Sequence, residues 1–144
     1  MHREVVALLA SGRIEQIAVM PELIKLYLND SLAHLKSAIS VSKSEDINGA
    51  YQLAYDSARK SCAALLAHHG FRATSRGGHH ALFLCARHFS PLIGSIFDDL
   101  ETFRKRRNFV EYPESVGQLV TPERLEYSLL LAGDVLKIVS QTVA

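Results

Sequence analysis

The sequence lacks the features that mark several large classes of protein. It contains no apolar run long enough to cross a membrane, and its N-terminus lacks the charged region and long apolar core of a secretion signal. The formal net charge is +1 and charged residues make up 22% of the chain, so the molecule has no overall excess of positive charge that would attract nucleic acid. These absences predict a soluble, cytoplasmic protein in which anion binding depends on a local cluster of cations.

Cysteine is scarce, and no metal-binding pattern is visible. Cys62 and Cys85 stand alone inside apolar helical patterns, without the C-x-x-C spacing of a zinc or redox site. The seven histidines include the pairs His68-His69 and His79-His80, but neither pair has the i, i+4 spacing of a helical zinc site. No acidic residue stands beside either pair. We therefore expect two buried free thiols, no metal site and no other cofactor.

Strand signals are also lacking. No period-two alternation of apolar and polar residues is bounded by turn residues, and no Asn-Gly or Asp-Gly hairpin or glycine-rich phosphate loop occurs. Apolar residues recur instead at helical spacing, without a fixed-period repeat or an interdomain linker. The chain of 144 residues has a length typical of one domain. The sequence thus predicts an all-α bundle that forms a single domain over residues 1–144.

Capping and turn residues predict where the helices begin and end. Proline at a first turn beside an acid marks helix starts at Pro21 and at Pro122, where Thr121 supplies a capping hydroxyl. Ser44 is expected to cap a central helix of small residues that ends at Gly70. The expected helices therefore cover residues 2–10, 21–43, 45–69, 79–89, 91–109 and 122 onward, with a polar connector at 71–78 and a loop at 114–120.

Four consecutive cations near the end of the 91–109 helix are the most informative feature of the sequence. Counting back from Arg107 in helical steps leads to Phe103 and Leu100, so this guanidinium group continues the apolar stripe of its helix. A buried charge is costly unless it is paired, so Arg107 is expected to face a partner or a ligand. Its neighbours fan round to the other faces, where they form either a solvated helix end or a phosphate-binding surface; they are Arg104, Lys105 and Arg106.

Several short motifs on this helical pattern resemble a known family. They are Tyr51-x-x-Ala54-Tyr55-Asp56-x-Ala58-Arg59-Lys60, Ala64-Leu65-Leu66, Gly70-Phe71-Arg72, Ser75-Arg76-Gly77-Gly78-His79-His80 and Arg106-Arg107-Asn108-x-x-Glu111-Tyr112. Together they resemble a HEPN domain over roughly residues 21 to 140. The resemblance implies an up-and-down bundle of four to five helices that forms a homodimer in a prokaryotic defence or toxin-antitoxin system. It also implies partners such as RNA, a nucleotide, a nucleotidyltransferase or an antitoxin.

The family's signature is an arginine and a histidine separated by four to six residues. Arg107 and Asn108 match its first part, whereas Tyr112 stands where the histidine of the short spacing would fall. Tyrosine has a pKa of about 10 and is a poor proton shuttle at neutral pH, so the resemblance implies RNA or nucleotide-phosphate recognition through these three residues. Alternatively, the protein is a metal-independent endoribonuclease with a histidine recruited from His79 or His80, or an inactive subunit that binds a partner.

Overall fold

The structure, a computed structural model, describes residues 1–114 and 119–144. In these residues seven helices and one two-stranded sheet are found. Their order is α1 (Arg3–Ala10), β1 (Ile14–Gln16), α2 (Pro21–Val41), α3 (Ile47–His68), β2 (Phe71–Ala73), α4 (Gly78–Ala86), α5 (Pro91–Ser95), α6 (Phe97–Glu111) and α7 (Pro122–Val143). The mainly helical class is confirmed, whereas the expectation that strands are absent is wrong.

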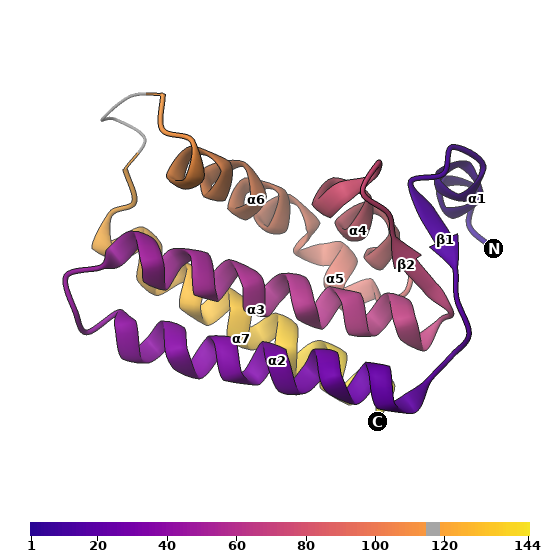
Figure 1. Cartoon of the computed structure of the whole chain (residues 1–144), viewed down its shortest axis with the longest axis horizontal. Coiled ribbons are helices and arrows are strands. Elements are labelled where there is room, and N and C mark those ends of the chain that lie inside the picture. Colours follow the sequence, from indigo (N-terminus) through magenta and orange to yellow (C-terminus); the bar gives the residue numbers. More distant parts are fainter. Residues whose placement is uncertain (115–118) are drawn as a thin grey trace.

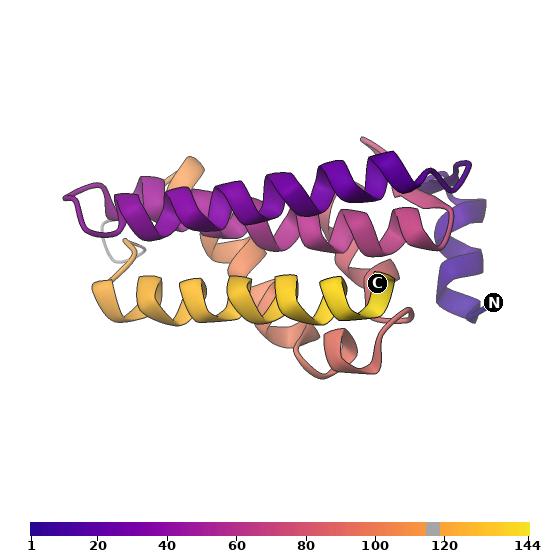
Figure 2. The same ribbon diagram turned by 90° about the horizontal axis from the view of Figure 1, so that it is seen from below.

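α3 is the central helix, as its small residues predict. In Figure 1 it lies between α2 on one side and the shorter α4 and α6 on the other, and Figure 2 shows α7 running alongside the α2–α3 pair. Ala50, Ala54 and Ala58 on its buried face have no exposed surface and allow neighbouring helices to approach closely. α3 therefore packs against four other helices, α2, α4, α6 and α7, rather than against the two neighbours expected from the sequence.

A cluster of three buried serines joins α2 to α3. The hydroxyl of Ser31 donates to the carbonyl oxygen of Ser57 at 2.8 Å, and its oxygen lies 2.7 Å from the hydroxyl oxygen of Ser61. All three side chains have no exposed surface. Because each buried hydroxyl has a partner, the cluster fixes the two helices against each other without leaving an unpaired polar group.

The start of α3 differs from the sequence signal, whereas its end agrees with it. Asp46, not Ser44, caps α3, since its carboxylate accepts the backbone N–H of Gly49 at 2.9 Å. Ser44 belongs to the preceding turn, where its hydroxyl donates to the carbonyl oxygen of Val41. Gly70, with a φ of 82°, ends α3 as predicted, because this left-handed conformation favours glycine.

The single helix expected from residue 91 to 109 is divided in two. Ser90 caps α5 by accepting the backbone N–H of Ile93 at 3.3 Å, and Ile96 then leaves the helical region with a φ of −112° and a ψ of 13°. The buried side chains of Leu100 and Phe103 continue the inner face in α6, so the apolar stripe survives the break. The expected loop at 114–120 falls largely on residues 115–118, which lie outside the described residues.

A short antiparallel ribbon attaches the N-terminal segment to the bundle. β1 pairs with β2, with Ile14 opposite Ala73 and Gln16 opposite Phe71, and the β2 segment replaces part of the connector expected at 71–78. Each strand has only three residues, too few for alternation to be recognised in the sequence. No helix within the described residues is long and apolar enough to span a membrane.

Candidate anion-binding site

Three helices meet in a cationic junction on one side of α3. The first turn of α4 supplies His79, the second half of α6 supplies Arg104 and Arg107, and the middle of α3 supplies Tyr55 and Arg59. These side chains come from positions far apart in the sequence. The sequence-predicted residues His79 and Arg107 are therefore brought to one place by the packing of α4 and α6 on α3.

Two glycines shape the turn that leads into α4. A Cβ atom on Gly77 would lie 2.3 Å from the carbonyl oxygen of Arg13, and Gly78 has a φ of 57°. The hydroxyl of Thr74 donates to the carbonyl oxygen of Gly12 at 2.6 Å and fixes the start of the same turn against the N-terminal segment. Gly77 is thus required by the close approach of two backbone segments, and Gly78 is favoured by its left-handed conformation.

His79 is a half-buried imidazole at the centre of the junction. Its Nδ1 lies 2.9 Å from the hydroxyl oxygen of Tyr55, so a hydrogen bond joins α4 to α3. Burial lowers the pKa of His79 to about 4, and the guanidinium groups of Arg59 and Arg107 act in the same direction. Near pH 7 the imidazole is therefore neutral and lies in a positive electrostatic potential.

Arg59 and Arg107 retain unused hydrogen-bonding capacity. The guanidinium carbon of Arg107 lies 5.7 Å from the centre of the Tyr55 ring, and its Nη2 lies 3.5 Å from the carboxylate of Glu111. Arg59 pairs with Asp56 at 3.3 Å. The Nε atoms of both arginines are buried and have no hydrogen-bond partner in the part of the chain that the structure describes. An unpaired buried donor costs about 1–3 kcal/mol, so a ligand that supplied acceptor oxygens would be favoured here.

An open hollow of about 340 Å³ lies between the start of α4 and α6. On its edge, the carboxylate of Glu101 accepts a hydrogen bond from Nε of Arg104 at 2.9 Å and also pairs with Nδ1 of His80. This shared carboxylate holds the arginine and the histidine side by side. The residues that line the hollow are Gly77, Gly78, His79, His80, Arg104 and Asn108.

The remaining residues expected at the site do not line this hollow. Lys105 is exposed to solvent, and the charge of Arg106 acts on Tyr51, a different tyrosine from the one beside His79. Arg107 lies against Tyr55 and is not part of the hollow's lining. Tyr112 follows the last turn of α6 and is 73% exposed. The hollow is thus lined by one of the three residues of the predicted motif, Asn108, and by neither Arg107 nor Tyr112.

Sequence reasoning did not assign a role to Tyr55, Asp56, Arg59 or Glu101. Asp56 and Arg59 lie three residues apart on a helix that is otherwise rich in alanine. This spacing is the sequence signal that could have identified these two as site residues. The side chain of Glu101 is only 13% exposed because it is held between His80 and Arg104. Its spacing of three residues from Arg104 is the corresponding signal.

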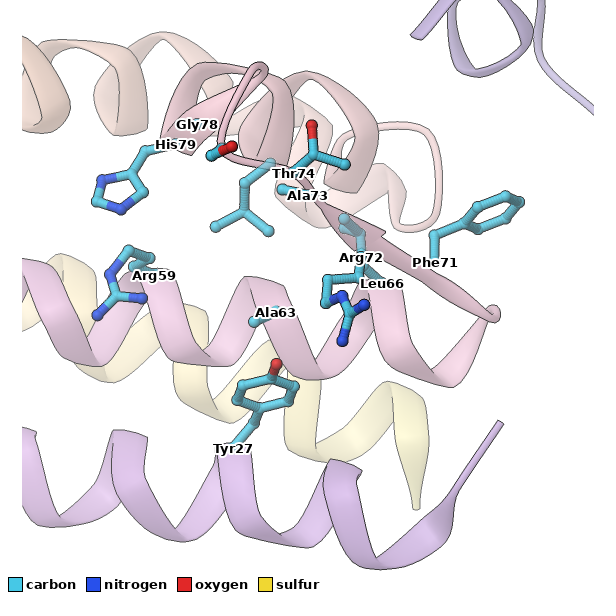
Figure 3. A pocket seen from close by; sticks show the side chains of 12 residues that line it. Tyr27, Arg59, Ala63, Leu66, Phe71, Arg72, Ala73, Thr74, Gly78 and His79 are labelled. Atoms are coloured by element: carbon cyan, nitrogen blue, oxygen red, sulfur yellow. The ribbon is translucent and has the colours of Figure 1, made fainter. Parts of the chain in front are cut away.

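A second pocket, of about 320 Å³, borders the junction on the side of α2 and β2. Figure 3 shows Arg59 and His79 at one end of this pocket, with Ala63 on α3 further along and the hydroxyl of Tyr27 directed towards it from α2. Gly78 and His79 line both the pocket and the hollow. The two spaces are therefore neighbours that share the first turn of α4.

No group of three or more histidine, cysteine, aspartate or glutamate side chains in residues 1–114 and 119–144 is placed to hold a metal ion. His79 and His80 are directed to different partners, Tyr55 and Glu101. Cys62 and Cys85 are buried free thiols, as predicted, and burial raises the pKa of each to about 12. The junction thus combines three arginines, the carboxylates that pair with them and neutral hydrogen-bonding groups.

Comparison with other proteins found no family model, curated protein or solved structure that matches this chain.

Proposed function

We propose that the protein recognises RNA or a nucleotide phosphate at the cationic junction of α3, α4 and α6. The observation that carries this proposal is the setting of His79, a half-buried imidazole whose pKa is lowered first by burial and then by the charges of Arg59, Arg107 and Arg104, against the opposing charge of Asp56. Phosphate oxygens accept several hydrogen bonds at once, and arginine is the side chain best suited to donate them. A phosphate would supply acceptors to the donors that have none.

The excess of hydrogen-bond donors in the junction favours an anion over a neutral ligand. The three arginines each have one carboxylate nearby, namely Asp56, Glu101 and Glu111. A guanidinium group has five N–H donors, so one carboxylate leaves most of them free to bind another acceptor. The first turn of α4 adds the positive end of a helix dipole beside Gly78. The proposal follows from this excess of donors rather than from net charge.

The resemblance to HEPN domains supports the same proposal and extends it to the assembly. A homodimer with its two-fold axis near α6 would bring two copies of Arg107 and Tyr112 together, which would enlarge a small site into a groove. The exposed position of Tyr112 leaves its ring free to stack on a base or to contact a second copy. We place such a dimer in a defence or toxin-antitoxin setting.

The arginines provide the test of RNA recognition. Binding of a short RNA oligomer is to be measured at two salt concentrations for the natural protein, for Arg107→Ala and for Lys105→Ala as a matched control. We expect Arg107→Ala to lower the affinity for the RNA about tenfold, because it removes a hydrogen-bonded contact. Lys105→Ala, at an exposed position, should lower the affinity much less. Equal losses of affinity in the two variants would indicate only non-specific electrostatic attraction and would contradict the proposal.

A second candidate function, metal-independent RNA cleavage, is favoured by the hydrogen bond between Tyr55 and His79. This bond orients an imidazole that could accept a proton from a ribose hydroxyl. Its pKa of about 4 makes it a weak base in the free protein, but a bound phosphate would offset the arginines and raise the pKa. The proton-transfer role therefore depends on the ligand being in place.

Cleavage in the presence of EDTA separates the two functions. If the protein only binds RNA, the natural protein leaves RNA intact and Tyr112→His, which restores the histidine of the family signature, gains activity. If His79 or His80 transfers the proton, the natural protein cleaves RNA and the double variant His79→Ala, His80→Ala does not. Cleavage by the natural protein that survives in the double variant would exclude both histidines.

A further inference from the structure

The pocket beside the junction has a polar end and an apolar wall. Arg59 and His79 form a polar end, and the side chains of Ala63, Leu66 and Leu82 form an apolar wall. Such a volume, about 320 Å³, is at the lower end of the range found for small-molecule sites. The pocket is therefore large enough for one small ligand with a charged end and a flat or apolar body.

The hydroxyl groups of Tyr27 and Ser75 also belong to the lining. Figure 3 shows the side chain of Tyr27 extending from α2 towards the pocket, and Ser75 lies in the turn after β2. Neither hydroxyl has a hydrogen-bond partner within the described residues. Lys60 lies over the ring of Tyr27, with its Nζ 5.7 Å from the ring centre. The two hydroxyl groups can form hydrogen bonds with the polar edge of a heterocycle whose faces lie against the apolar wall.

We propose that this pocket binds one nucleoside monophosphate unit, free or at an RNA terminus, with its phosphate between Arg59 and His79 and its base against Ala63, Leu66 and Leu82. The inference rests on the proposed recognition of nucleotide phosphate, and it specifies a single nucleotide held in a pocket. An aliphatic acid would fill the apolar part but would form no hydrogen bond with either hydroxyl. A phosphate alone would leave the apolar part empty.

The connection between pocket and hollow explains how one nucleotide and a longer chain share the site. Gly78 and His79 line both spaces, so a phosphate placed beside His79 stands at the boundary between them. The base then extends into the pocket, and a following nucleotide extends over Arg104 and Asn108 in the hollow. The two spaces thus bind successive parts of one ligand.

Calorimetric titration with adenosine monophosphate and with ribose 5-phosphate tests the inference. The two compounds share the sugar phosphate, so the difference in affinity measures the contribution of the base. We expect adenosine monophosphate to bind about tenfold more tightly or better, which corresponds to about 1.4 kcal/mol. Equal affinities for the two compounds would overturn the assignment of the base to the pocket.

Filling the pocket should remove this difference. Ala63→Phe places a ring where the base is proposed to lie, so it should reduce the affinity for adenosine monophosphate to that of ribose 5-phosphate. The control Ala33→Phe makes the same substitution at an exposed position of α2 and should change neither affinity. Tyr27→Phe, which keeps the ring and removes only the hydroxyl, should weaken binding of adenosine monophosphate several-fold and provides a second test if Ala63→Phe does not fold.

The same titrations distinguish failure of this inference from failure of the proposed function. A protein that binds a short RNA oligomer through Arg107 but shows no preference for adenosine monophosphate keeps the proposed function and loses the pocket. A protein that binds neither RNA nor either compound loses both. Tight binding of adenosine monophosphate that is unaffected by Ala63→Phe would place the nucleotide outside the pocket.

Discussion

The two sides of α3 differ in how completely their polar groups are satisfied. Towards α2, the hydroxyls of Ser31, Ser57 and Ser61 are fully buried and bonded to one another or to the backbone. Towards α4 and α6, buried Nε atoms of Arg59 and Arg107 have no partner in the described part of the chain. A satisfied network stabilises a fold, whereas unsatisfied donors are retained where a ligand can complete them. One helix thus combines a structural face with a binding face.

The largest effect on stability is expected on the serine side. Ser61→Leu would force a branched side chain between α2 and α3 and remove a partner of the Ser31 hydroxyl. The free energy of unfolding should fall by about 3 kcal/mol, from overpacking together with a lost buried hydrogen bond. Urea denaturation measures this loss, and Ser40→Leu at an exposed position of α2 is the control. A loss below about 1 kcal/mol would show that the interface is loosely packed.

The next largest effect concerns His79 and acid. Its pKa is about 4 in the folded protein, below the ordinary value of 6.5, so between these pH values the unfolded chain binds more protons. Stability is therefore retained above about pH 6.5 and falls as the pH is lowered towards 4, by about 2 kcal/mol for this group. His79→Gln should flatten this part of the pH profile, as measured by thermal denaturation. An unchanged profile would mean that His79 is not the group responsible.

A smaller and more local effect is expected when one cation of the junction is removed. Arg107→Gln should raise the pKa of His79, because Arg107 is one of the charges that disfavour the protonated imidazole. Titration of the imidazole followed by NMR measures the change, and Lys105→Gln is the control on an exposed face of α6. Inorganic phosphate should shift the pKa of the natural protein in the same direction. A pKa that responds equally to both substitutions would contradict the proposed geometry.

The smallest effect is expected for Arg107→Ala on stability. Its ion pair with Glu111 is a partly exposed i, i+4 contact of 3.5 Å, a kind that contributes little. The free energy of unfolding should change by no more than about 0.5 kcal/mol. Urea denaturation of Arg107→Ala and of Ser61→Leu compares the free energies of unfolding lost on the two sides of α3. A loss of several kcal/mol would identify Arg107 as a structural group rather than a ligand-binding group.

Most helices could be predicted because their signals are local. Pro21, Thr121 and Gly70 mark helix ends through backbone geometry that their own side chains determine. The β1–β2 ribbon could not be predicted in this way, because Glu15 and Arg72 pair across 57 residues. The break at Ile96 was also hidden, since the apolar stripe continues on both sides of it.

The candidate site was predictable only in part for the same reason. The run of cations and the histidine pair were visible in the sequence, and the structure brings His79, His80, Arg104 and Asn108 to one hollow. The sequence of one helix does not determine which of its cations faces inward. Arg107 follows the apolar stripe, but its place against the Tyr55 ring depends on how α6 packs on α3.

The ribbon has a consequence for the order in which the protein folds. Ile14 and Ala73 are separated by the whole of α2 and α3, so closing this contact costs more chain entropy than forming the α2–α3 pair. The turn that contains Gly77 packs directly on Arg13, so it acquires its final shape only when the ribbon closes. The first turn of α4 is thus expected to be assembled late, on a helical framework that is already in place.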